Sequence, residues 1–312
     1  MASHSGTARL LERLSPAPGV VAAVPGEAVA VTVDTLVEGG HFFPHTDPRR
    51  LGRKALAVNL SDLAAMGAVP LGWTLLLQWP AEGDEAWLEP LVGGLEEETR
   101  DRGVRCLGAT LCRGPLALTI QAIGRVSPAG ALRRDRGRPG QRLAVTGHLG
   151  VAAWALRRLE AGERLDADDP ARLALELPEP QLAAGRALVE LATAAIDLSD
   201  GLLQDLGHIL RASGVGATLE LERLPLEAGM VSQLGRQEAL RLALAGGDDY
   251  QLCFSYDPLR EEEVARRLAA AGVAWSPIGW LEAEAGVRLR LDGRPFDGAG
   301  ITGWDPFRGA VR

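Results

Sequence analysis

The chain has 312 residues, 46% of them hydrophobic, and a formal net charge of −8 at pH 7. This length allows two domains of about 150 residues or one large domain. The acidic balance argues against a nucleic-acid-binding surface, because such a surface needs clustered positive charge to displace counterions.

The cysteines and the N-terminus indicate the compartment. Cys106, Cys112 and Cys253 form no CxxC pattern and no metal-ligand grouping with histidine. Residues 1–10 lack the basic-then-apolar order of a signal peptide, and no run of about 18 apolar residues occurs in the chain. We therefore expect a cytoplasmic protein that is not attached to a membrane.

The first part of the chain predicts alternating strands and helices. Small and β-branched apolar residues in AVAVTVD, residues 28–34, predict a buried strand that ends at Asp34. A helix is expected over 48–66, with an interruption near 59–62. The other expected elements are a strand at 72–80, a helix at 85–102 and two strands between 104 and 126.

A segment rich in glycine, proline and arginine, residues 127–142, breaks this pattern and predicts a domain boundary. We place the domains at 1–136 and 137–312. The second part again alternates, which predicts a two-domain α/β protein. Its expected strands lie near 143–146, 217–226, 251–256 and 275–283, and its expected helices follow Gly150 and cover 181–194, 201–213, 237–244 and 259–271.

Three acidic segments carry the candidate chemistry: NLSD at 59–62, DLSD at 197–200 and GGDDY at 246–250. Asp62 or Asp200 could cap a helix and stabilise it by ~1 kcal/mol. Capping does not account for Asp197, one turn upstream, or for Asp34 at a strand end. Clustered carboxylates repel one another unless a cation joins them, and oxygen ligands favour magnesium or calcium over zinc. The pattern hints at phosphoryl transfer without a Walker motif.

Four segments together resemble the thiamine-monophosphate kinases, in the superfamily of aminoimidazole ribonucleotide (AIR) synthetase, selenophosphate synthetase and the hydrogenase maturation protein. They are VTVDTLVEGGHF (31–42), KALAVNLSDLAAMGAVP (54–70), AIDLSDGLLQDLGHI (195–209) and AGGDDYQLCF (245–254). The resemblance implies an AIR-synthetase-like α/β (α+β) fold whose N-terminal sheet pairs with that of a second subunit. It also implies that ATP phosphorylates thiamine monophosphate to thiamine diphosphate, with ATP bound between the two domains.

The resemblance also assigns candidate site residues. It implies several Mg²⁺ ions and no general acid or base, so that catalysis rests on in-line positioning and charge neutralisation. The implied metal ligands are Asp34, Asp62, Asp197, Asp200 and Thr32. The implied nucleotide contacts are Gly108, Ala109, Thr110, Arg134 and Ser199, and the implied substrate contacts are His41, Asp248, Asp249 and Trp304. The implied partners are ATP, thiamine monophosphate and a second copy of the chain.

Several positions depart from the family pattern. Val20 and Val21 stand where the family has two metal-binding aspartates, and Thr110, in what the resemblance makes a turn at 108–111, replaces a third. In the linker, Arg136 replaces a glycine and Gln141 an acid. Two hypotheses therefore stay open: an active kinase in which the four remaining aspartates suffice, or a homologue that binds nucleotide or thiamine phosphate without efficient turnover. A third, in which ATP activates a carbonyl or amide oxygen, is disfavoured by the DTLVEGGHF segment.

Overall fold

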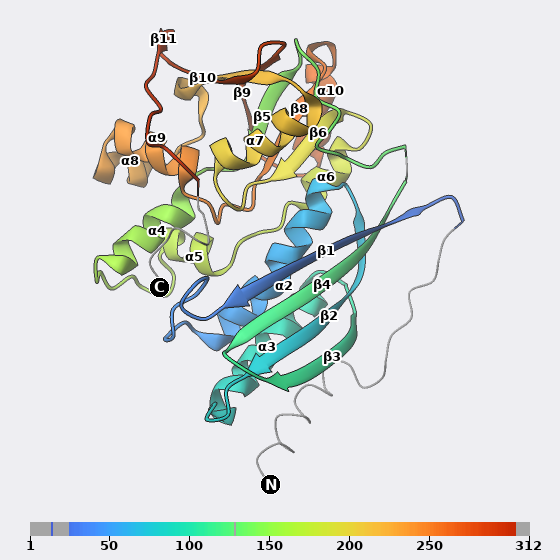
Figure 1. The fold of residues 1–312 in the computed structure, drawn as a ribbon, viewed down its shortest axis with the longest axis vertical. Coiled ribbons are helices and arrows are strands. Elements are labelled where there is room, and N and C mark those ends of the chain that lie inside the picture. Colours follow the sequence, from blue (N-terminus) through green and yellow to red (C-terminus); the bar gives the residue numbers. More distant parts are fainter. Residues whose placement is uncertain (1–13, 15–24, 128, 304–312) are drawn as a thin grey trace. The chain divides into compact units, whose positions relative to one another are not determined.

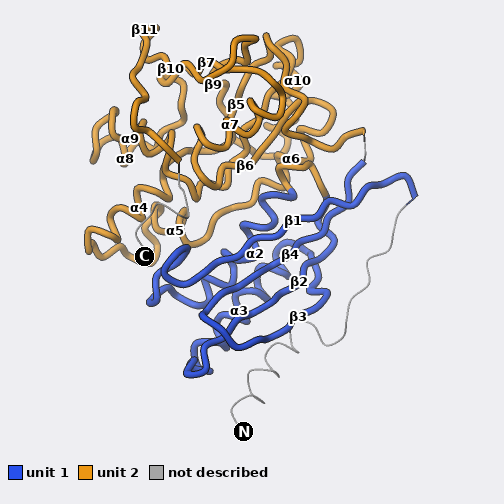
Figure 2. Tube along the Cα trace, in the orientation of Figure 1, with its two compact units in different colours: residues 1–63, 69–128, 306–312 blue, residues 64–68, 129–305 orange. Residues whose placement is uncertain are grey.

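The computed structural model describes residues 14, 25–127 and 129–303, and the chain divides into two compact units (Figures 1 and 2). The described residues of unit 1 are 14, 25–63 and 69–127, and those of unit 2 are 64–68 and 129–303. The domain boundary after residue 136 stays a prediction. No helix within these ranges has both the length and the apolar character that a membrane span requires.

Unit 1 contains a mixed four-stranded sheet in the order β1-β4-β2-β3. β1 pairs antiparallel with β4, β4 pairs antiparallel with β2, and β2 pairs parallel with β3. β1 and β3 are therefore the two edges of this sheet. The strands are β1 (Ala28–Val37), β2 (Val69–Trp79), β3 (Cys106–Arg113) and β4 (Ala117–Val126).

Helices α2 (Pro48–Ala65) and α3 (Glu85–Asp101) cover one face of this sheet (Figure 1). They approach closely at Gly52, where an added Cβ would lie 2.2 Å from the Leu91 carbonyl oxygen. The expected interruption of the first helix near residues 59–62 is wrong. Asn59 is tolerated in the middle of α2 because its Nδ2 donates to the Ala55 carbonyl oxygen at 3.0 Å, one turn earlier.

The other face of the unit 1 sheet carries exposed apolar side chains. On β1, Val29 is 62%, Val31 50% and Val33 60% exposed. The alternate residues Ala30 and Leu36 are buried beneath the helices, as the period of two in a strand requires. This surface, defined by Val29, Val31, Val33 and Leu76, is called the open valine face below.

Unit 2 contains a mixed seven-stranded sheet in the order β11-β10-β7-β9-β5-β8-β6. Only the β10–β7 pair is parallel, and the other neighbouring strands run antiparallel. The strands are β5 (Arg142–Thr146), β6 (Ala192–Asp197), β7 (Gly216–Glu220), β8 (Leu252–Tyr256), β9 (Trp275–Glu282), β10 (Gly286–Leu291) and β11 (Arg294–Pro295).

Helices pack on both faces of the unit 2 sheet. On one face, Val145 and Ile196 pack with α7 (Leu202–Ser213) and α9 (Arg236–Ala245). On the other face, Ala195 and Phe254 pack with α6 (Leu182–Leu188) and α10 (Glu261–Ala270). The remaining helices are α4 (Val151–Glu160), α5 (Pro170–Glu176), α8 (Ala228–Leu234) and the short η1 (Leu221–Arg223) and η2 (Pro258–Arg260).

One expected helix of the second half is partly wrong. The helix predicted over 181–194 ends at Leu188, and residues 192–197 form β6. Alanine favours helices in isolation, but Ala194 and Ala195 are buried on opposite faces of the sheet between helices. Small side chains at these positions let both helical layers approach, so tertiary packing overrides the local helix preference.

Candidate functional site

The two acidic loops of unit 2 lie side by side. β6 and β8 are antiparallel neighbours, and their pairing ends at Asp197 and Leu252. Beyond that point the loops continue the ladder. The Leu198 N–H donates to the Gln251 carbonyl, the Tyr250 N–H to the Leu198 carbonyl and the Asp248 N–H to the Ser199 carbonyl, each at 2.8 Å. DLSD and GGDDY, about 50 residues apart in the chain, therefore form one structural feature.

Glycine is required where these loops touch. Gly247 has a φ of 70°, and an added Cβ would lie 2.6 Å from the Ser199 carbonyl oxygen. Gly201 has a φ of 108°, and its added Cβ would lie 2.8 Å from the Ala245 backbone. Asp248 adopts a φ of 58° in the same turn, a left-handed conformation that aspartate tolerates better than most residues.

Asp200 is held by the first turn of α7. The Asp205 carboxylate accepts the Asp200 backbone N–H at 3.0 Å, and Gln204 Nε2 donates to Asp200 Oδ2 at 3.0 Å. Asp205 is only 3% exposed. Burial raises the pKa of Asp205 to about 7, against the opposing effect of the N–H groups of Asp200 and Gly201. Sequence reasoning missed Gln204 and Asp205, although their polar side chains at the start of an apolar helix were a visible signal.

Arg134 acts electrostatically on the same helix. Its backbone carbonyl accepts the Ser213 hydroxyl at 2.8 Å, which ties the linker to the end of α7. The Arg134 charge lowers the pKa of Asp205, opposing the effect of burial there. Burial is the main cause of the lowered pKa of His208, and Arg134 adds to it. The Arg134 charge thus acts on side chains of α7.

The Asp249 side chain points toward the start of α4. Both of its carboxylate oxygens accept the Gly150 N–H, at 2.9 and 3.0 Å, at the N-terminus of α4. Burial raises the pKa of Asp249 well above its ordinary value. Its neighbour Asp248 instead accepts the Tyr250 hydroxyl at 3.1 Å. The two aspartates of GGDDY thus differ in their hydrogen-bond partners, a difference that the sequence alone did not show.

Unit 1 brings together three of the proposed metal ligands. Thr32 and Asp34 lie on one face of β1, and the Thr32 hydroxyl donates to an Asp62 carboxylate oxygen on α2. The Asp34 backbone N–H donates to Asn59 Oδ1 at 3.1 Å. Asn59, which sequence reasoning did not single out, therefore ties β1 to α2 at Asp34.

His41 lies in the loop that follows β1. Its Nδ1 accepts the Val37 N–H at 3.2 Å, and its own backbone N–H donates to the Val37 carbonyl at 2.9 Å. The neutral ring therefore carries its proton on Nε2, the nitrogen suited to donate a hydrogen bond to a phosphate oxygen.

The segment Gly108–Thr110 is separated from Asp34 within unit 1. It lies inside β3 rather than in the expected turn, at the sheet edge opposite to β1. Three strand spacings amount to about 14 Å. Thr110 pairs with Leu76 and is exposed, whereas Ala109 pairs with the buried Leu75. The Thr110 side chain therefore lies on the open valine face of the sheet, whereas the Asp34 side chain lies on the face that the helices cover.

The donor atoms fit a hard cation. Among the residues that the structure describes, no group of three or more His, Cys, Asp or Glu side chains could hold a metal ion by itself. Asp34 and Asp62 belong to unit 1, and Asp197 and Asp200 to unit 2. Oxygen donors in small number suit magnesium, which retains waters and binds through one or two carboxylates and substrate phosphates. Trp304, Val20 and Val21 lie outside the described residues.

Known proteins share both the sequence and the fold of this chain. The family models described as AIR synthase related protein match residues 17–126 for the N-terminal domain and 138–292 for the C-terminal domain. A thiamine-monophosphate kinase of Salmonella typhimurium is 41% identical over 288 residues, which cover 90% of this chain and 87% of that protein.

Solved structures agree with this similarity. The crystal structure of thiamine-monophosphate kinase from Stenotrophomonas maltophilia K279a matches with a TM-score of 0.83 at 35% identity, covering 95% of this chain and 98% of that one. AaThiL complexed with AMPPCP and TMP matches with a TM-score of 0.78 at 24% identity, covering 95% and 94%, which shows a shared fold. The chain therefore belongs to the thiamine-monophosphate kinases, within the AIR synthase-related superfamily.

Proposed function

We propose that this chain transfers the terminal phosphoryl group of ATP to thiamine monophosphate and so forms thiamine diphosphate and ADP. The observation that carries this proposal is the 41% identity to a thiamine-monophosphate kinase over 90% of the chain. In the reaction, a phosphate oxygen of thiamine monophosphate bonds to the terminal phosphorus of ATP as the bond to the ADP oxygen breaks. We infer that the protein acts in the cytoplasm, as the sequence predicts.

We assign the proposed metal ligands of each unit to magnesium, namely Asp34, Asp62 and Thr32 in unit 1, and Asp197 and Asp200 in unit 2. Bound magnesium would neutralise negative charge on the phosphoryl group in transit. No proton acceptor is needed, because the attacking phosphate oxygen already carries negative charge near neutral pH. The proposed role of these side chains is therefore to position the metal.

The remaining contacts concern the two substrates. We assign Arg134 and Ser199 to the phosphates of ATP, because the Arg134 charge acts on α7, directly after the DLSD loop. We assign His41, through Nε2, to the phosphate of thiamine monophosphate, and Asp248 and Trp304 to the thiamine part. Asp249 belongs to the same loop but acts through Gly150.

We propose further that the protein is a homodimer joined through the open valine face. Val29, Val31 and Val33 offer exposed apolar surface on an edge strand, which is the kind of patch that proteins use for association. The resemblance to the family implies the same pairing of N-terminal sheets. Such an arrangement would be symmetric.

A second candidate function is binding of nucleotide or thiamine phosphate without turnover, and it is favoured by Val20, Val21 and Thr110. Incubation with ATP, magnesium and thiamine monophosphate, followed by mass spectrometry for thiamine diphosphate, separates the two. Steady product formation supports the kinase. Calorimetric binding of ATP or thiamine monophosphate without product supports the second candidate. Absence of product and of binding of either compound would reject both candidates.

A further inference from the structure

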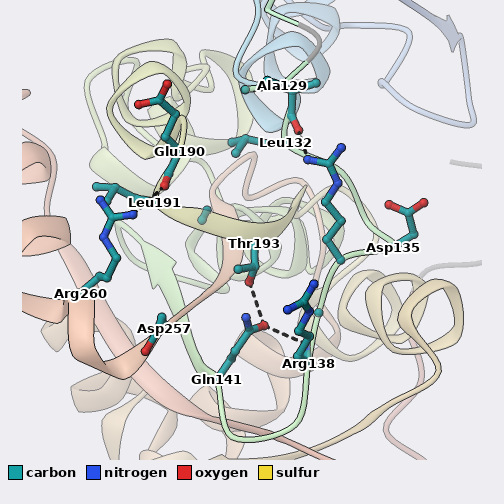
Figure 3. A pocket seen from close by; sticks show the side chains of 15 residues that line it. Ala129, Leu132, Asp135, Arg138, Gln141, Glu190, Leu191, Thr193, Asp257 and Arg260 are labelled. Atoms are coloured by element: carbon teal, nitrogen blue, oxygen red, sulfur yellow. Dashed lines mark hydrogen bonds between the residues drawn. The ribbon is translucent and has the colours of Figure 1, made fainter.

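An open pocket of about 520 Å³ lies in unit 2, and none of the proposed metal, nucleotide or thiamine contacts lines it (Figure 3). Its walls come from linker residues 129–132 and 135–138, Gln141, the segment 190–193 at the start of β6, and Asp257 and Arg260 after the end of β8. In the β6–β8 register, Ala192 pairs with Tyr256 beside the pocket, whereas Asp197 pairs with Leu252 at the acidic loops. Five residues of strand separate the two places by about 17 Å.

A buried amide forms part of the pocket. Gln141 is only 9% exposed, and its Oε1 accepts both the Arg138 backbone N–H and the Thr193 hydroxyl, each at 2.8 Å (Figure 3). The Arg138 N–H can only donate, so the oxygen of the amide must face it. Its Nε2 is then the other amide atom, and no residue in the described ranges accepts a hydrogen bond from it. The pocket thus has a fixed donor that the protein itself does not use.

Two guanidinium groups of the pocket retain N–H donors that form no hydrogen bond with a described residue. Arg138 makes no side-chain hydrogen bond or ion pair with any residue that the structure describes, and Arg136 makes only a 3.5 Å contact with the Ala131 carbonyl. Arg260, by contrast, is already engaged, since it pairs with Glu263 at 2.5 Å and donates to the Glu190 carbonyl at 3.0 Å. Arg136 and Arg138 therefore form the cationic side of the pocket.

The acidic residues of the pocket offset only part of this positive charge. Asp135 is hydrogen-bonded to Arg133, a residue outside the lining, at 2.5 and 2.8 Å, and this pair, with a smaller contribution from the Arg136 charge, lowers the pKa of Asp135 to about 2. Asp257 accepts the Leu259 N–H at 2.9 Å at the start of η2. Figure 3 shows the Glu190 carboxylate turned away from Gln141 and Arg138.

We propose that this pocket binds a small phosphate-bearing molecule, whose phosphate is held by the guanidinium groups of Arg136 and Arg138 and by the amide nitrogen of Gln141. Guanidinium forks match phosphate oxygens in pairs and form charge-assisted hydrogen bonds with them. The volume falls in the range of about 300–1,000 Å³ that small-molecule sites occupy. The proposal does not depend on the kinase reaction, because no residue of that reaction lines the pocket.

The test is titration calorimetry of the full-length protein with inorganic pyrophosphate, in EDTA and without nucleotide. Without metal, the acidic loops repel the anion, and the arginine variants below distinguish binding in the pocket from binding near Arg134. We expect saturable binding to the unaltered protein. Arg136→Gln and Arg138→Gln should each raise Kd at least about tenfold, since each removes charge-assisted hydrogen bonds. The matched control is Arg157→Gln, an exposed arginine of α4 that pairs with Glu238 and should leave Kd unchanged.

Two results would overturn the proposal. One is the absence of saturable binding of pyrophosphate or inorganic phosphate at millimolar concentration. The other is an unchanged Kd in the Arg136→Gln, Arg138→Gln double variant. Both arginines are exposed, so the variants should unfold at the same temperature as the unaltered protein, which a thermal scan verifies.

Discussion

The carboxylate of Asp205, buried in the first turn of α7, accepts the backbone N–H of Asp200 at 3.0 Å. Asp200 is a proposed magnesium ligand, and its carboxylate is in turn held by Gln204. Two neighbouring residues of one helix thus fix the backbone and the side chain of the same aspartate. Groups that orient a metal ligand in this way typically affect metal affinity about 10- to 100-fold.

Replacing Asp205 should impair the metal step rather than substrate binding. For Asp205→Ala we expect kcat to fall at least about tenfold and half-maximal activity to need more magnesium, with little change in KM for thiamine monophosphate. Asp205→Asn keeps one acceptor oxygen and should lose less. The measurement is initial rate against magnesium concentration. An alanine variant with unaltered kcat and magnesium dependence would contradict the positioning role.

Asp249 should make stability depend on pH. Its pKa is raised in the folded protein by burial, so the folded state binds more protons than the unfolded state above about pH 4. Its contribution to stability is therefore full below the unfolded pKa and is lost as the pH rises through the folded pKa. Asp249→Asn removes this titration and retains an oxygen for the Gly150 N–H. The measurement is urea unfolding at several pH values. As the pH rises, the free energy of unfolding should decline less for the variant than for the unaltered protein.

A matched control for this experiment is Asp168→Asn, at an exposed position of the loop before α5. It should follow the pH profile of the unaltered protein. If Asp249→Asn also follows that profile, the Asp249 carboxyl does not titrate as inferred.

Local pattern predicted much of the fold but not its long-range contacts. The existence of β1 follows from its apolar, β-branched residues and that of β8 from a short apolar run. However, β1 continues past the predicted end at Asp34 to Val37, and its face with Val29, Val31 and Val33 is exposed rather than buried. The nearness of DLSD and GGDDY depends on pairing of β6 with β8, which no local window contains. β6 itself was partly predicted as helix, because its alanines carry a helix preference that burial between two helical layers overrides.

The LSD sequence, which occurs twice in the chain, adopts two different structures. In unit 2 it is a loop before a helix, whereas Ser61 and Asp62 lie inside α2. The difference arises because Asn59 satisfies its polar groups through Ala55 and the Asp34 N–H, so the helix continues. The alternative that Asp62 caps a helix is therefore wrong. The local sequence does not show this, because it depends on the packing of β1 on α2.

Thr32 should support Asp62 through its hydroxyl. Thr32→Val preserves shape but removes the donor to the Asp62 carboxylate, so we expect kcat to fall several-fold and the magnesium requirement to rise. Thr35→Val, on the opposite face of β1, is the matched control and should stay near the unaltered rate. Equal kinetics of the two variants would show that the hydroxyl does not orient Asp62.

The open valine face should govern assembly. Val31→Glu adds a charge in the middle of that face and should convert the expected dimer to monomer, as measured by light scattering coupled to size-exclusion chromatography. Val287→Glu makes the same change on β10 of unit 2 and should not alter the mass. A dimer that survives Val31→Glu, or a monomeric unaltered protein, would place the proposed interface in error.

The central claim is that the aspartates of the acidic segments suffice for phosphoryl transfer to thiamine monophosphate. The most direct measurement is the rate of thiamine diphosphate formation from ATP, magnesium and thiamine monophosphate, compared between the unaltered protein, Asp62→Asn and the exposed control Asp168→Asn. We predict steady turnover that Asp168→Asn retains and Asp62→Asn lowers at least about a hundredfold. No product from the unaltered protein, or an Asp62→Asn variant as fast as the control, would contradict it.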